Sequence, residues 1–305
     1  MRYLPKFFIV CFAVFCLLCI PSADTYAEDD VQFLYTIIGG KAIITGCEQD
    51  AEFIEIPSVI ESCPVTEIGS RAFSNHSALK RVIFPETLRK IGDYSFYACY
   101  SLETANLPSE LEKLGEGAFC GCTQLAYMGL PEKLTEIPDS CFRACTNMTE
   151  TEIPWGVKKI GSYSFSGCTK LGYVSLGGGL EKVGERAFFM CGELRNVYIP
   201  SSVKEIGREA FGFIPSNDGA AVKNGFRIFG CSDATAQKYA EFNGIEYHSA
   251  PDALKVLAMH DLSAPAVKIS ERTVLIVLFS FIILYALKNK YRKKLKKLRK
   301  VFIRQ

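Results

Sequence analysis

Histidine is scarce in this 305-residue sequence, which contains only His76, His248 and His260. None of the three lies beside a nucleophile motif, so the Ser/His/Asp and Cys/His arrangements of nucleophilic catalysis have no support in the sequence. A Walker-type phosphate loop is also missing, because no Gly-Lys-Ser or Gly-Lys-Thr follows the glycine run 177–179. These absences predict a protein that is not an enzyme. An active site on a terminal module of the chain is the enzymatic alternative.

The same shortage limits metal binding. Cys120 and Cys122, and likewise Cys141 and Cys145, are spaced closely enough for a metal, but no paired histidine accompanies either pair. We therefore expect no metal, no other cofactor and no nucleic-acid partner. Asn-x-Ser/Thr motifs begin at Asn75 and Asn147, and they would carry glycans only in a eukaryotic source.

Acidic residues are missing from the last part of the chain. Residues 288–305 contain ten Lys or Arg and no Asp or Glu, whereas residues 28–272 contain 23 Lys or Arg and 32 Asp or Glu. The longer segment therefore has a net charge of 23 − 32 = −9, which the formal net charge of +2 for the whole chain conceals. A basic tail of this kind favours anionic lipid head groups.

Phenylalanine, in contrast, recurs at a fixed interval of 23 residues. The same register holds an aliphatic residue five positions before each Phe, a cysteine three positions after it in five copies, and a leucine or methionine six positions after it in six copies. A fixed period in this range is the signature of a solenoid built from stacked coils. The seven phenylalanines are Phe73, Phe96, Phe119, Phe142, Phe165, Phe188 and Phe211.

Each column predicts one part of the coil. The positions nine and eleven after the Phe are mostly apolar and alternate with polar ones, which predicts a short strand with one buried face. A proline at position twelve ends this strand in every full copy except the one with Gly177, because proline cannot donate to a strand ladder. The glycine after the aliphatic residue is expected to permit a tight bend, and Phe and Cys to lie on a compact turn or short helical piece. Coils stacked about 4.8 Å apart would share one core.

The pattern IGxxAFxxCxxL, followed by apolar-x-apolar-Pro, resembles the BspA-like leucine-rich repeats, a class of bacterial and protozoan cell-surface proteins. The resemblance covers roughly Ile56 to Phe213. It implies a β-rich, right-handed leucine-rich-repeat solenoid with one short strand and one turn or short helix per coil. It also implies adhesion to host or neighbouring-cell components. Pro138 in the glycine column and Thr151 in an apolar column are local departures.

The N-terminus has the features of a secretory signal. Arg2 and Lys6 precede the apolar run Phe7–Ile20, and Thr25-Tyr26-Ala27 offers a small-residue cleavage site. An uncleaved anchor is the alternative.

Export would permit disulfides among the ten cysteines that follow. Five of these form the repeat column, where parallel Cβ vectors disfavour a bond, so we expect buried free thiols there; the pairing of the other five stays open.

Both ends of the solenoid need a cap, because an open end would expose core and unpaired strand groups. Two apolar stretches separated by Gly39-Gly40 predict a hairpin before the first coil, and residues 61–64 predict an enlarged loop in it. After Phe213 we expect a polar, turn-rich stretch over 215–225 and a strand over 226–229. A helix capped by Ser232 or Asp233 follows and runs to about Phe242, with Asn243-Gly244 as its stop and a closing strand over 245–247.

Thr273–Leu287 is free of charge, and at 1.5 Å per residue it is somewhat shorter than the hydrocarbon core of about 30 Å. Snorkelling of Arg272, Lys288 and Lys290 can make up the difference, so we expect a spanning helix over Thr273 to Asn289; a helix lying in the interface is the alternative. The basic residues beyond it place the C-terminus in the cytoplasm and the repeats outside.

The predicted segments are a signal peptide (1–27), an N-terminal cap hairpin (28–55), the solenoid (56–213), a C-terminal capping module (214–248), a linker (249–272), a transmembrane helix (273–289) and a basic cytoplasmic tail (290–305).

The candidate binding surface is the outward face of the predicted strands, eight and ten residues after each Phe. The inward positions repeat whereas these vary, and tyrosines among them offer the rigid anchors that are enriched in binding hot spots. A merely solvated sheet face and binding through loop tips are the alternatives. The candidate residues are Arg81, Ile83, Thr104, Asn106, Tyr127, Glu150, Glu152, Tyr173, Asn196 and Tyr198.

These observations favour a membrane-anchored cell-surface protein that binds extracellular or host proteins or glycans without catalysis. A structural or assembly scaffold of the cell envelope, with the basic tail on lipid or an inner partner, is the alternative.

Overall fold

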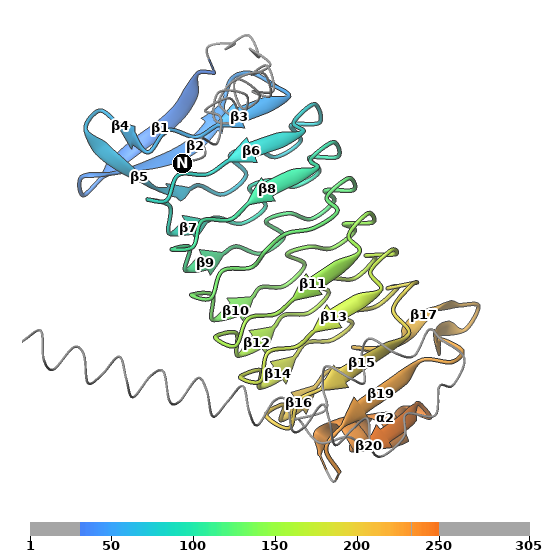
Figure 1. The fold of residues 1–305 in the computed structure, drawn as a ribbon. Helices are drawn as coiled ribbons and strands as arrows, with labels where there is room; N and C mark the ends of the chain where they lie inside the picture. Colours follow the sequence, from blue (N-terminus) through green and yellow to red (C-terminus); the bar gives the residue numbers. More distant parts are fainter. Residues whose placement is uncertain (1–30, 233, 250–305) are drawn as a thin grey trace, which may run out of the picture. The chain divides into compact units, whose positions relative to one another are not determined.

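The computed structural model describes residues 31–232 and 234–249. These residues form a β-solenoid whose coils stack in chain order between an N-terminal hairpin and a C-terminal module (Figure 1). The predicted signal peptide, transmembrane helix and basic tail, and the linker beyond Ser249, lie outside them. Within the described ranges, no helix combines the length and the apolar character that crossing a bilayer requires.

Most coils contribute two short parallel strands, where the repeat pattern predicted one. In the first ladder, a charged residue faces out and an aliphatic residue faces in, as in exposed Lys90 and buried Ile91. Strands of two residues are too short to display an alternating pattern in the sequence, which is why this ladder was not predicted. It consists of β5 (Cys63–Ile68), β7 (Lys90–Ile91) and β9 (Lys113–Leu114), then β10 (Glu136–Ile137), β12 (Lys159–Ile160), β14 (Lys182–Val183) and β16 (Glu205–Ile206).

The second ladder is the predicted one, and its strands are interrupted twice. Its central residues Val82, Ala105, Thr151, Val174 and Val197 are buried as expected, including the polar Thr151. Residues 127–130 form no strand, although the repeat places one there. The strands are β3 (Phe53–Glu55), β6 (Arg81–Ile83) and β8 (Thr104–Asn106), then β11 (Glu150–Glu152) and β13 (Tyr173–Ser175), then β15 (Asn196–Ile199) with two strands of the C-terminal module.

The seven repeat phenylalanines form one continuous stack in the core. Each is at most 1% exposed. Neighbouring rings lie almost parallel, with centroids 4.9 to 5.8 Å apart and interplanar angles between 3° and 16°. This offset geometry is one that aromatic pairs favour. The predicted buried aromatic stripe is therefore confirmed.

The cysteine column lies beside this stack as free thiols. Cys99, Cys122, Cys145, Cys168 and Cys191 are buried, and each Sγ–H donates to the carbonyl of the Phe in the preceding coil at 3.1 to 3.4 Å. The predicted buried thiols are confirmed, and their hydrogen bond explains why a small, weakly polar side chain suits the column. His76, which occupies the same column in the first copy, is half-buried with its ring edge against Phe73 at 5.6 Å.

Burial raises the pKa of the Cys168 thiol from 9.0 to about 12. The unfolded thiol therefore loses its proton at a lower pH than the folded one, so the free energy of unfolding should fall as pH rises from about 9 towards 12. We expect the Cys168→Ala variant to lose less stability over this interval, by up to about 1.4 kcal/mol per pH unit. Urea unfolding at several pH values checks this, with Ser166→Ala as the non-titrating control. Identical pH slopes for wild type and Cys168→Ala would contradict it.

The glycine column serves close packing between coils rather than a tight bend. Its members have no positive φ, but an ideal Cβ on Gly115 would lie 2.3 Å from the backbone nitrogen of Asp93 in the preceding coil. The left-handed turns fall two residues before and after the Phe instead, and several hold bulky residues such as Arg71 (φ 61°) and Tyr94 (φ 54°). The predicted reason for the glycines was therefore wrong, because a sequence column does not show the distance to the next coil.

The N-terminal cap is the predicted hairpin, with β1 (Phe33–Ile38) antiparallel to β2 (Lys41–Cys47). Strand β2 also pairs in parallel with β5 and so joins the cap to the first ladder. The expected larger loop is a second small hairpin, in which β4 (Val59–Ile60) pairs with the start of β5 across Glu61 and Ser62, both at positive φ.

The C-terminal module continues the second ladder. Strand β19 (Arg227–Gly230) pairs in parallel with β15 and with β20 (Glu246–Ser249), and α2 (Thr235–Asn243) ends at Gly244 in the left-handed conformation, as predicted. The N-cap residue of the helix is Ala234, whose side chain makes no capping bond, so the predicted N-cap at Ser232 was wrong; Asp233, the other predicted cap, lies outside the described residues. The stretch predicted as turns, 215–225, overlaps a hairpin of β17 (Phe213–Ser216) and β18 (Gly219–Val222).

Candidate interaction surface

The predicted outward face is largely exposed along the second ladder. Six of its ten candidate residues are exposed, and Ile83, Tyr173 and Asn196 are half-buried. Arg81 lies over the ring of Phe53 in the adjacent strand, with 5.8 Å between the guanidinium carbon and the ring centroid. The exposed six are Arg81, Thr104, Asn106, Tyr127, Glu150 and Glu152.

Tyr198, predicted as a surface anchor, is fully buried instead. Strand β19 covers this end of the ladder and pairs Tyr198 with Phe229, and the Tyr198 hydroxyl lies 3.9 Å from the Sγ of Cys231. The C-terminal module has turned an outward position into an interior one. Tyr198 therefore belongs to the core of that module and cannot contact a partner.

A groove of about 260 Å³ extends from the third to the fifth full coil and includes the segment where the strand is missing. Two of the ten candidate residues, Tyr127 and Glu152, line it together with residues of the turns that follow the strand positions. Tyr127 is 49% exposed and Trp155, the single tryptophan of the chain, is 71% exposed. The lining residues are Tyr127, Gly129, Leu130, Glu132, Glu152, Ile153, Pro154, Trp155, Ser175 and Gly177.

Pro138 marks the boundary between the third and fourth full coils. At this position most other coils have a glycine whose N–H donates to the preceding coil, as Gly92 does to the Ile68 carbonyl at 2.8 Å. Proline has no N–H to donate, and the first ladder is interrupted here, between β9 and β10. The phenylalanine stack is also widest here, with 5.8 Å between Phe119 and Phe142. The groove thus includes the coil boundary at which Pro138, the break in the first ladder and the widest step of the Phe stack coincide.

The glycine run 177–179 makes room for Trp155. An ideal Cβ on Gly178 would lie 2.5 Å from Cη2 of the Trp155 ring, so only glycine lets the indole lie over the next coil. At Gly177, where the other full copies have proline, an ideal Cβ would lie 2.5 Å from the Pro154 carbonyl oxygen of the preceding coil, so this position also requires glycine. Trp155 is consequently held by the following coil while most of its surface remains in solvent.

The groove and its surroundings are acidic. Glu132 and Glu152 line it and Glu150 lies two residues from Glu152 on β11; all three are exposed. In the part of the chain that the structure describes, none of these three carboxylates forms a salt bridge, although Lys–Glu pairs are frequent elsewhere along the ladders. The arrangement offers two exposed aromatic rings beside unpaired negative charge.

No group of three or more His, Cys, Asp or Glu side chains within residues 31–232 and 234–249 is arranged to hold a metal ion. The closely spaced cysteines at 120–122 and 141–145 lie in the turn columns of the solenoid, with Cys122, Cys141 and Cys145 buried.

A solenoid of 23-residue coils with buried Phe and Cys columns defines a leucine-rich-repeat class of protein. The family described as BspA type Leucine rich repeat region (6 copies) matches residues 47–157 and 135–229, which together span more than half of the 305-residue chain. The chain therefore belongs to the BspA-type leucine-rich repeat family. No curated protein matches it.

Two solved structures of bacterial leucine-rich repeat proteins are similar to this chain. A leucine rich cell surface protein from Faecalibacterium prausnitzii is 27% identical with a TM-score of 0.52, and the match covers 65% of this chain and 60% of that one. A T. pallidum leucine rich repeat protein is 25% identical with a TM-score of 0.46, and the match covers 53% of this chain and 87% of that one. This chain thus spans less than two thirds of the F. prausnitzii protein.

Proposed function

We propose that this protein is displayed at the cell surface, where it binds an extracellular protein through the groove between Tyr127 and Trp155. The F. prausnitzii protein of similar fold is described as a cell surface protein, and the BspA-type family supports the same setting. The proposal includes export by residues 1–27, an anchor at residues 273–289, and the basic tail 290–305 on anionic lipid at the cytoplasmic side. The protein has no catalytic role in this proposal.

The binding site is inferred from one observation: Trp155, 71% exposed, and Tyr127, 49% exposed, line the same groove as two exposed carboxylates that form no salt bridge within the described residues. Tryptophan and tyrosine are the residues most enriched in interface hot spots, and a surface that displays them without a partner is characteristic of a binding site. The acidic rim selects for a partner that presents a Lys or Arg beside an apolar side chain. Such a partner is a protein segment rather than a neutral glycan.

We expect Trp155→Ala to weaken binding at least tenfold, since it removes the larger anchor. The full-length chain is titrated against an immobilised extracellular-matrix protein extract and, separately, a cell-envelope extract. Tyr127→Ala should have a similar effect, and Glu152→Gln a smaller one that weakens as salt is raised. Phe242→Ala is the matched control, because Phe242 is 90% exposed on α2, away from the groove residues in the chain.

Equal retention of wild type and Trp155→Ala would refute the groove as the binding site. The envelope-scaffold alternative predicts a different result. If the protein is a scaffold, deletion of residues 290–305 changes its localisation or complex formation and leaves its binding to the extracts unchanged.

A further inference from the structure

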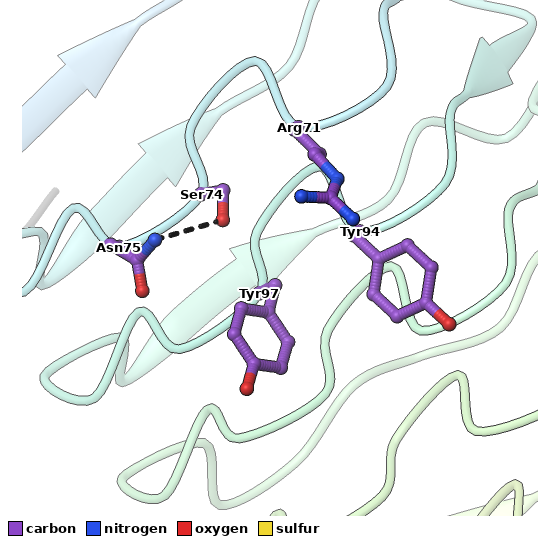
Figure 2. Close-up of a pocket in the computed structure, with 5 residues that line it drawn as sticks. All are labelled: Arg71, Ser74, Asn75, Tyr94 and Tyr97. Carbon is purple, nitrogen blue, oxygen red and sulfur yellow. Dashed lines mark hydrogen bonds between the residues drawn. The ribbon is translucent and has the colours of Figure 1, made fainter.

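A second hollow, of about 420 Å³, lies on the turns of the first two full coils. Five polar or aromatic side chains line it: Arg71, Ser74, Asn75, Tyr94 and Tyr97. Figure 2 shows Ser74 and Asn75 on one side of the Arg71 guanidinium and the Tyr94 ring on the other. These residues lie one or two positions from the repeat Phe, so they belong to different columns from the strand-face candidates.

Arg71 brings an unpaired positive charge to this hollow. Its guanidinium carbon lies 5.6 Å from the centroid of the Tyr94 ring, and it forms no salt bridge within the described residues. The carboxylates of Glu116 and Asp93, on the following coils, each have a hydrogen-bond partner other than Arg71. Glu116 accepts a hydrogen bond from the Tyr94 hydroxyl at 2.5 Å, and Asp93 accepts one from the Glu116 backbone N–H at 2.9 Å. The planar fork of Arg71 donors therefore remains available to an anion.

Two aromatic rings form the other wall. The hydrogen bond to Glu116 fixes Tyr94 and raises its pKa to about 12, so the ring stays neutral. Gly117 makes room for this ring, since an ideal Cβ there would lie 2.4 Å from Tyr94 Cε1. Tyr97 is 41% exposed and meets Tyr94 edge to face with 6.0 Å between the ring centroids. The ring faces offer an apolar platform for flat C–H surfaces.

Ser74 and Asn75 complete the set of hydrogen-bonding groups. The Asn75 side-chain amide donates to the Ser74 hydroxyl oxygen at 3.2 Å. This bond leaves the Ser74 O–H as a donor and the Asn75 carbonyl oxygen as an acceptor. A neutral donor and acceptor side by side match the hydroxyl groups of a sugar, which both donate and accept.

We propose that this pocket binds a carboxylated sugar unit, such as one residue of an acidic polysaccharide. Arg71 pairs with the carboxylate, Ser74 and Asn75 bind ring hydroxyls, and the tyrosine rings contact the C–H face. A single cation with two aromatic rings suits one carboxylate on an apolar ring better than a phosphate, which favours several cationic groups. The site is independent of the Tyr127–Trp155 groove, so either can fail without the other.

The test titrates the full-length chain with glucuronic acid, glucose and acetate. Glucose lacks the carboxylate and acetate lacks the ring, so we expect each to bind at least about tenfold more weakly than glucuronate. Arg71→Gln should lower glucuronate affinity about tenfold, while Arg71→Lys, which keeps the charge but loses the fork, should lower it less. Tyr97→Ala should weaken binding of glucuronate but not of acetate.

Arg143→Gln is the matched control. Arg143 is also exposed, and its guanidinium carbon also lies 5.6 Å from a tyrosine centroid, that of Tyr163. Affinity equal to wild type in this variant supports the pocket, whereas an equal loss in Arg71→Gln and Arg143→Gln would overturn it. So would equal affinities for glucuronate and glucose, or no saturable binding. Thermal unfolding of each variant verifies that the fold is intact.

Discussion

Replacing Phe142 with alanine is expected to lower the free energy of unfolding by about 3 to 5 kcal/mol. The Phe142 ring is 1% exposed and lies between Phe119 and Phe165, with centroid distances of 5.8 and 5.3 Å. Its removal leaves a cavity with rings on both sides that the stacked coils cannot close without shifting their backbones. It also severs the stack in the middle, where each coil depends on its neighbours for stability.

Chemical unfolding of the full-length chain, followed by far-ultraviolet circular dichroism, measures this loss. Phe242→Ala is the matched control, because the same atoms are removed from a side chain that is 90% exposed, and its effect should be within about 0.5 kcal/mol. If Phe142→Ala does not accumulate as a folded protein, Phe142→Leu retains most of the volume and should cost about 1 to 2 kcal/mol. A similar stability for Phe142→Ala and Phe242→Ala would contradict the continuous core.

The side-chain columns were predictable because each follows from one coil's own need to bury an apolar face. The Phe stack, the thiols beside it and the strand of the second ladder all follow from the 23-residue period. The two-residue strands of the first ladder were not predictable, because Lys90 and Ile91 alone carry no pattern. The burial of Tyr198 was missed for a different reason. It depends on pairing with a module that follows the last repeat and has its own sequence.

Trp155 was also missed, although the repeat contains a signal for it. The column thirteen residues after the Phe holds small or acidic residues in every other full copy, so a tryptophan there is an outlier with no core role. Comparing each copy with its own column, rather than searching for shared residues, identifies it. The other members of the column are Glu86, Ser109, Glu132, Gly178 and Ser201.

Pro138 shows how one departure from the repeat can shape a surface. The sequence predicted only a local departure in the glycine column. In the structure it coincides with the break in the first ladder, the widest step of the Phe stack and the groove that contains Trp155. A proposed binding site therefore occurs where the repeat is least regular, which is expected if regular coils serve the core and irregular ones serve recognition.

Gly115→Ala is expected to destabilise the solenoid by about 3 kcal/mol, at the upper end of the usual cost of overpacking. The added methyl carbon would lie 2.3 Å from both the Asp93 nitrogen and the Gly92 carbonyl carbon. Both are backbone atoms of the preceding coil, so no flexible side chain can move aside and the coils must separate. The φ of Gly115 is not positive, so strain in the residue's own backbone is not the cause.

Gly172→Ala is the matched control, since its new methyl would meet nothing closer than the Glu193 Cβ at 3.8 Å. Because alanine restricts the unfolded chain more than glycine does, Gly172→Ala should leave stability unchanged or raise it by up to about 1 kcal/mol. Thermal unfolding of the two variants beside wild type gives shifts of opposite sign or very different size. Equal shifts of the unfolding temperature in the two variants would contradict this prediction. They would mean that the glycine column is explained by chain flexibility and not by close contact between neighbouring coils.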